Sequence, residues 1–153
     1  MNDAVDFFLA TKSDLIAIDA LEQQCFAGHS YPDFFFRQAL DCWPNGFLIA
    51  KDSQGSVLGY LLASTSAEVD THWVLSVAVA DTARGQGIGG QLISRLISTL
   101  PAEVNYLQLT VAPDNPAKAL YARHGFIEHG FEADYFGKGE PRLLMRFAKA
   151  ENT

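Results

Sequence analysis

One run of residues has the spacing of a phosphate-binding loop. It reads Arg84-Gly85-Gln86-Gly87-Ile88-Gly89-Gly90. Glycines permit positive φ and let backbone N–H groups come close to a ligand. A helix that begins at this run would add its dipole and its unpaired N–H groups, so a diphosphate could bind mainly to the main chain.

The flanks of the run predict a turn between a strand and a helix. Before it, residues 73–79 are mostly apolar and rich in β-branched side chains, as a buried strand requires. After it, apolar residues recur on one helical face over residues 88–100. We therefore predict an unbroken strand, turn and helix over residues 73–100.

Spacing distinguishes three kinds of phosphate-binding turn. The Walker pattern ends in Gly-Lys-Ser/Thr, and the run contains no lysine. Gly85, Gly87 and Gly90 satisfy the dinucleotide pattern G-x-G-x-x-G, but a Rossmann domain needs several βαβ units and an acidic residue about 20 positions further on. Only one βαβ unit can be recognised in this sequence, and position 105, where the acidic residue would be expected, is Asn.

Arg84, Gly87 and Gly89 form the third pattern, R-x-x-G-x-G, and at this loop the chain resembles the GNAT superfamily of acetyl-CoA-dependent N-acetyltransferases. Residues 115–126, NPAKALYARHGF, resemble its second signature, N-x-x-A-x-x-L-Y-x-x-x-G-F. The distance from Asn115 to Tyr121 is six residues where the family often has seven, which leaves Asp114 or Asn115 as the cofactor contact. A glycine-rich turn without a ligand is the alternative interpretation of the loop.

The resemblance implies a single α/β domain over residues 1–153, with a mixed, partly splayed sheet and helices on both faces. It implies acetyl-CoA as cofactor, bound by Val77, Ala78, Val79, Arg84, Gly85, Gln86, Gly87, Ile88, Gly89, Gly90, Asn115 and Tyr121. Tyr121 is the expected catalytic residue, because a phenol near the sulfur can donate a proton or hydrogen bond to the leaving thiolate. The alternative roles are core packing for Tyr121 and helix capping for Asn115.

On the acceptor side, the resemblance implies contacts from Phe26, His29, Tyr31, Ser76, Thr110 and Tyr135. Residues 135–145, YFGKGEPRLLM, resemble in part the Y-Y-x-x-G-E-D-A-x-x-M ending of ribosomal-protein and other protein N-terminal acetyltransferases. Thr110 stands where the bacterial ribosomal-protein enzymes carry a glutamate base. A base could instead act through water from His72, Ser76 or Tyr135.

We therefore predict transfer of an acetyl group to a primary amine by direct attack on the thioester, with a protein or peptide N-terminus as the first choice of acceptor. The alternatives are a small amine, such as a polyamine, an amino acid or an aminoglycoside-like compound, and a non-catalytic module that senses acyl-CoA. Thr110 favours the sensing module, and Tyr121 argues against it.

Composition excludes several other classes. The net charge of −7 disfavours nucleic acid as a partner and suits a cationic acceptor. No apolar run has the length of a membrane span, and the acidic N-terminus lacks the lysines of a signal peptide, so we expect a cytoplasmic protein without a membrane partner. Cys25 and Cys42 are expected to be free thiols, and no metal-binding pattern is present.

The remaining elements follow from periodicity and from helix-capping residues. Ser13 is expected to cap a helix over residues 14–24, and Asn115 one over residues 117–124 that ends at Gly125. A short aromatic-rich helix is expected at 33–40. Strands are predicted at 6–10, 46–51, 56–63, 106–111, 126–131 and 142–147, with a frayed tail at 148–153.

Overall fold

The structure is a computed structural model, and it describes residues 4–150. The chain divides into two compact units. The first comprises the described residues up to Ser64 together with Ser76–Thr99, and the second comprises Thr65–Leu75 together with the described residues from Leu100 onward. Strand β4 (Thr71–Val79) contributes residues to both units.

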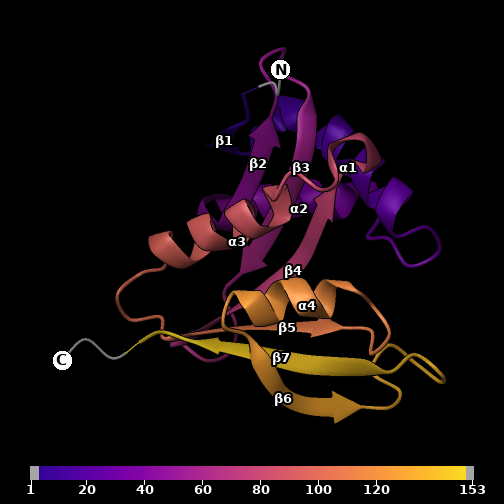
Figure 1. Cartoon of the computed structure of the whole chain (residues 1–153), viewed down its shortest axis with the longest axis vertical. Coiled ribbons are helices and arrows are strands. Elements are labelled where there is room, and N and C mark those ends of the chain that lie inside the picture. The colour runs from indigo at the N-terminus through magenta and orange to yellow at the C-terminus, as the bar shows by residue number, and fades with distance from the viewer. Residues whose placement is uncertain (1–3, 151–153) are drawn as a thin grey trace. The chain divides into compact units, whose positions relative to one another are not determined.

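The first unit contains the glycine-rich loop together with the strand end before it and the helix after it (Figure 1). Its strands and helices are β1 (Asp6–Leu9), α1 (Leu15–Cys25), α2 (Asp33–Cys42), β2 (Phe47–Lys51), β3 (Val57–Ser64), the end of β4, and α3 (Ile88–Thr99). Short 3-10 helices lie at Lys12–Asp14, Pro44–Gly46 and Asp81–Ala83. Strands β1, β2 and β3 pair antiparallel.

A tight turn joins β2 to β3 and makes them a hairpin. The Oδ1 atom of Asp52 accepts hydrogen bonds of 2.9 Å from the backbone N–H groups of Gln54 and Ser56. Gly55 has a φ of 84°, a left-handed conformation that glycine adopts without steric cost. An aspartate and a glycine therefore fix this turn.

Helices cover both faces of the sheet in the first unit. Neighbouring residues of a strand point to opposite faces, and Tyr60 of β3 contacts Phe36 of α2 with ring centroids 5.7 Å apart. Gly59 faces α3, where a Cβ atom would lie 3.2 Å from Cγ2 of Ile88 and 3.0 Å from the carbonyl oxygen of Ala78. The missing side chain at Gly59 lets the first turn of α3 pack close to the sheet.

The second unit contains the start of β4, then β5 (Tyr106–Val111), α4 (Ala117–Arg123), β6 (Ile127–Glu132) and β7 (Arg142–Ala148). Strand β4 pairs parallel with β5 from Thr71 to Trp73, while β7 pairs antiparallel with both β5 and β6. The buried apolar side chains of this unit include Val104, Leu107, Leu109, Val111, Phe126, Leu143 and Met145.

Across the described residues the strands form one mixed, unclosed sheet in the order β1-β2-β3-β4-β5-β7-β6. The family resemblance predicted a mixed α/β fold of this kind, and that prediction is confirmed. Among residues 4–150, none of the helices combines the length and the apolar character that crossing a membrane requires.

The predicted cap at Ser13 is wrong. Thr11 precedes a short 3-10 helix, and both its backbone N–H and its hydroxyl donate to Oδ2 of Asp14, at 2.8 and 2.9 Å. Asp14 also pairs with Lys51 at 2.9 Å. Burial alone would raise the pKa of Asp14, but the contacts with Lys51 and Thr11 together hold it below its ordinary value. Because Lys51 of β2 holds the Asp14 carboxylate, Thr11 and not Ser13 caps the first helical turn.

Other boundaries shift by one or two residues. Helix α2 continues to Cys42, and β4 begins at Thr71. The tail was predicted to fray from residue 148, but Ala148 belongs to β7, and the N–H of Lys149 donates to the carbonyl of Asn105 at 2.8 Å. Residues 151–153 of that prediction lie outside the described part of the chain.

Candidate active site

The glycine-rich loop has an exposed backbone that faces open space. Gly85 and Gly87 have φ values of 83° and 75°, and a Cβ atom at either position would meet no atom within 4 Å. The N–H of Gln91 donates to the carbonyl of Gly87 at 3.0 Å, which closes the first turn of α3. The N–H groups of that first turn have no acceptor within the helix. This arrangement fits a diphosphate bound by main-chain donors.

The four glycines do not share one role. Gly85 and Gly87 supply left-handed turns, whereas Gly89 and Gly90 lie inside α3. Ile88 is 2% exposed and points to the core beside Gly59, so the first residue of α3 anchors the loop. The strand–turn–helix prediction is confirmed, and Ile88 is placed as a packing residue whose backbone N–H belongs to the first turn.

Arg84 connects the loop to the end of α1. Its Nε lies 3.1 Å from Oδ1 of Asp81, in an exposed ion pair, and its Nη2 donates to Sγ of Cys25 at 3.8 Å. The thiol of Cys25 in turn donates to the carbonyl of Val79 at 3.6 Å. Cys25 is a free thiol, as predicted, and so is Cys42. These contacts bring the loop, the C-terminal end of α1 and the end of β4 together.

A buried polar network lies beside this end of β4. Glu22 is 2% exposed, and its Oε1 accepts hydrogen bonds from the hydroxyls of Tyr60 and Ser76, the latter at 3.0 Å. Its Oε2 accepts the backbone N–H of Tyr31 at 2.9 Å. Burial and the adjacent Glu22 carboxylate raise the pKa of Tyr60, so this phenol stays protonated and donates.

The network joins two of the predicted acceptor-side residues of the first unit, Tyr31 and Ser76. Tyr31 lies between α1 and α2, and its ring stacks on Phe35 with centroids 4.4 Å apart. In the same loop the N–H of His29 donates to the carbonyl of Phe26 at 2.9 Å. Ser76 was predicted by resemblance alone, and it shares the Glu22 carboxylate with the Tyr31 backbone.

Glu22 and Tyr60 are not among the residues predicted from the sequence. One signal was available, because Glu22 follows Ile18 by four residues and therefore lies on the face of α1 that Ile18 and Leu21 bury. A carboxylate on a buried helical face requires partners. Its partners Tyr60 and Ser76 are 38 and 54 residues away, and no local pattern points to them.

The second unit holds Asn115 and Tyr121. Oδ1 of Asn115 accepts the backbone N–H of Ala117 at 2.9 Å, so the predicted capping role at the start of α4 is present. Gly125 has a φ of 92° just after the end of α4, as predicted. The Tyr121 ring packs against Phe126 with centroids 5.9 Å apart. Burial raises the pKa of Tyr121 to about 12, and its hydroxyl is therefore protonated at neutral pH.

The predicted acceptor-side residues of the second unit are Thr110, in β5, and Tyr135, in the loop between β6 and β7. Thr110 lies in β5 opposite Leu144 of β7, and it is partly buried. Tyr135 is 39% exposed and meets the ring of Phe136 edge-on at 4.8 Å. Burial lowers the pKa of His72, while Glu103 opposes that shift, so the imidazole is mainly neutral near pH 7.

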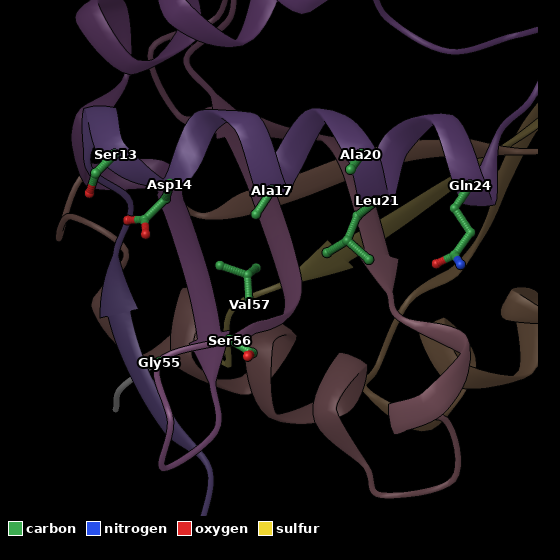
Figure 2. A pocket seen from close by; sticks show the side chains of 9 residues that line it. All are labelled: Ser13, Asp14, Ala17, Ala20, Leu21, Gln24, Gly55, Ser56 and Val57. Atoms are coloured by element: carbon green, nitrogen blue, oxygen red, sulfur yellow. The ribbon is translucent and has the colours of Figure 1, made fainter.

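An open hollow of about 470 Å³ lies between α1 and the start of β3 (Figure 2). Its lining consists of Ser13, Asp14, Ala17, Ala20, Leu21, Gln24, Gly55, Ser56 and Val57. None of these is a predicted site residue, and we assign the hollow no role in catalysis. In the described part of the chain, His, Cys, Asp and Glu side chains form no group of three or more that could hold a metal ion.

Residues 15–126 match the sequence profile of the acetyltransferase (GNAT) family, and the chain belongs to that family. Its similarity to known enzymes extends over most of its length. It is 30% identical to an uncharacterized N-acetyltransferase of Methanocaldococcus jannaschii, over 88% of this chain and 86% of that protein. It is also 30% identical to the N-terminal acetyltransferase A complex catalytic subunit NAA10 of Arabidopsis thaliana, over 90% of this chain and 74% of that subunit.

Solved structures share the fold. Ard1 from Thermoplasma volcanium superposes with a TM-score of 0.88 at 20% identity, covering 97% of this chain and 99% of that one. A NatC complex solved with Gag peptide and CoA gives a TM-score of 0.85 at 19% identity, covering 95% and 99% of the two chains. The chain is an acetyl-CoA-dependent N-acetyltransferase.

Proposed function

We propose that the acceptor is the α-amine of a protein or peptide. The observation that carries this proposal is the similarity over 90% of the chain to the catalytic subunit of an N-terminal acetyltransferase. The partial resemblance of residues 135–145 to the ending of protein N-terminal acetyltransferases supports it independently. The net charge of −7 suits an acceptor that approaches as a cation.

Acetyl-CoA supplies an activated acyl thioester, and the loop has the donors to hold it. The backbone N–H groups of residues 85–90 and the N-terminal dipole of α3 would bind the diphosphate. Arg84 adds a cation at the edge of the same loop. The backbone of Val77, Ala78 and Val79, and the side chain of Asn115 or Asp114, are the proposed contacts to the pantetheine arm.

Tyr121 is the proposed donor, of a hydrogen bond or of its proton, to the departing thiolate. With a pKa raised to about 12 by burial, its hydroxyl keeps its proton through the neutral range. A donor that remains protonated can stabilise negative charge that develops on sulfur only as the bond breaks. Backbone N–H groups near Val77 and Val79 are the proposed donors to the carbonyl oxygen of the thioester.

The acceptor must lose a proton before it attacks, and this requirement favours an α-amine. Near pH 7.5 roughly a third of α-amines but only about a thousandth of lysine side chains are neutral, given reference pKa values of about 7.7–8.0 and about 10.4. The difference corresponds to about 3 kcal/mol. Thr110 offers no carboxylate that could remove a proton, so the enzyme depends on the neutral fraction in solution.

Matched peptides test this proposal. One peptide has a free N-terminus and no lysine, and the other has a blocked N-terminus and one internal lysine. We expect faster thiol release from acetyl-CoA with the first peptide, and a rate that rises with pH up to the pKa of the α-amine. Equal or faster acetylation of the blocked peptide at neutral pH contradicts the proposal. A panel of polyamines and amino acids measured in parallel tests the alternative of a small amine.

A further inference from the structure

The Glu22 carboxylate connects three segments of the first unit that are distant in sequence. Oε1 binds the hydroxyls of Tyr60 in β3 and Ser76 in β4, and Oε2 binds the backbone N–H of Tyr31. Ser76 immediately precedes Val77, the first residue of the strand segment proposed to contact the cofactor. One side chain of α1 therefore relates the loop after this helix to the central strand.

The contacts of Glu22 indicate that it positions neighbouring residues and does not itself meet the acceptor. Both carboxylate oxygens are occupied by donors, and the side chain is 2% exposed, so an acceptor amine has no direct path to it. A backbone N–H cannot turn away from its partner as a hydroxyl can, and Oε2 thereby fixes where the Tyr31 backbone lies. Stacking of the Tyr31 ring on Phe35 then sets the direction of the side chain.

We propose that Glu22 is a positioning residue for the acceptor, because it holds Tyr31 and Ser76 at a fixed separation. This inference rests on the proposed function and on the acceptor contacts that the family resemblance implies for Tyr31 and Ser76. The essential property of Glu22 is its reach between two sets of donors. Its negative charge is secondary.

Two conservative variants distinguish the effect of the length of the Glu22 side chain from the effect of its charge. In Glu22→Gln the amide oxygen can accept the Tyr31 N–H, while the NH₂ group donates to the hydroxyl oxygens of Tyr60 and Ser76, which can rotate to accept. In Glu22→Asp the charge remains, but the side chain is one methylene shorter and can no longer span both sets of donors. Positioning therefore predicts that Gln preserves function better than Asp.

The experiment measures kcat and the two KM values, for peptide and for acetyl-CoA, with the full-length protein. We expect Glu22→Asp to raise the peptide KM by about tenfold or more, as for the loss of a hydrogen bond to a charged group, and to leave the acetyl-CoA KM unchanged. Glu22→Gln should stay close to the wild type. Gln23→Ala is the matched control, because Gln23 binds the same loop through an exposed hydrogen bond of 3.0 Å from Ser30, which water can replace.

Amide hydrogen exchange provides a second measurement that needs no turnover. The Tyr31 N–H should exchange faster in Glu22→Asp than in the wild type or in Glu22→Gln. The inference is overturned if Glu22→Gln is more impaired than Glu22→Asp, if both KM values rise together, or if Tyr31 exchange does not change. If the wild type acetylates no peptide, the proposed function fails, while the exchange measurement still decides whether Glu22 positions Tyr31.

Discussion

Gly87→Ala tests whether the loop binds the diphosphate, and Gly55→Ala is its matched control. Both glycines have left-handed φ values, 75° and 84°, and a Cβ atom at either meets no atom within 4 Å. Each substitution should therefore cost only the strain of an alanine in this conformation, about 1–2 kcal/mol. For a chain of this size that corresponds to a fall in Tm of roughly 2–8 °C.

The two variants should differ in affinity for CoA. At Gly87 the new methyl group enters the open space beside the backbone donors of the loop, and it would keep the phosphates at a distance from them. Loss of one charge-assisted hydrogen bond corresponds to a Kd increase of about 10- to 100-fold. Gly55 lies in the turn between β2 and β3, and its substitution should leave the Kd unchanged. Calorimetric titration with CoA measures both values, and equal affinities in the two variants would refute our assignment of the loop.

Two further substitutions test the chemistry and the packing. Tyr121→Phe should lower kcat by about 10- to 100-fold with little effect on the KM for acetyl-CoA, because the hydroxyl acts on charge that develops in the transition state. Since the pKa of Tyr121 is about 12, the wild-type rate should not decline on the alkaline side until the pH approaches that value, and wild-type turnover in the variant would show that Tyr121 only packs. Asp14→Asn should lower the free energy of unfolding at pH 7 by about 1–3 kcal/mol, because it removes a carboxylate paired with Lys51. The lowered pKa of Asp14 means that its contribution is present above the ordinary value of 3.8 and is lost as the pH falls through its folded-state value, so urea denaturation should show the difference between variant and wild type shrinking toward pH 3.

Much of the fold could be predicted because local patterns determine it. Strand β5 was predicted at residues 106–111 and is found there, because Leu107, Leu109 and Val111 alternate with less buried residues. The glycine-rich run predicted the turn, but it did not predict which glycines adopt positive φ and which lie inside α3. The sequence offers four glycines, and only the start of α3 at Ile88 determines which two adopt positive φ.

Features set by distant contacts could not be predicted. Thr11 and Ser13 are both good capping residues, and the choice between them depends on Asp14, which is held by Lys51 of β2. Glu22 resembles an ordinary helical glutamate until Tyr60 and Ser76 are placed beside it. Resemblance to the family identified Ser76 as a candidate but gave no reason for its role.

The Glu22 network has a consequence for the order in which the chain can mature during synthesis. A ribosome-bound chain that ends before residue 76 contains α1, α2 and the β2–β3 hairpin but lacks Ser76, and it also lacks α3, which covers the other face of β3 in the first unit. In such a nascent chain the Glu22 carboxylate lacks one of its donors, so burial of α1 is less favourable. Stable docking of the first helix is therefore expected only after the glycine-rich loop and α3 have left the exit tunnel, which couples completion of the N-terminal half to synthesis of the loop that we propose binds the cofactor.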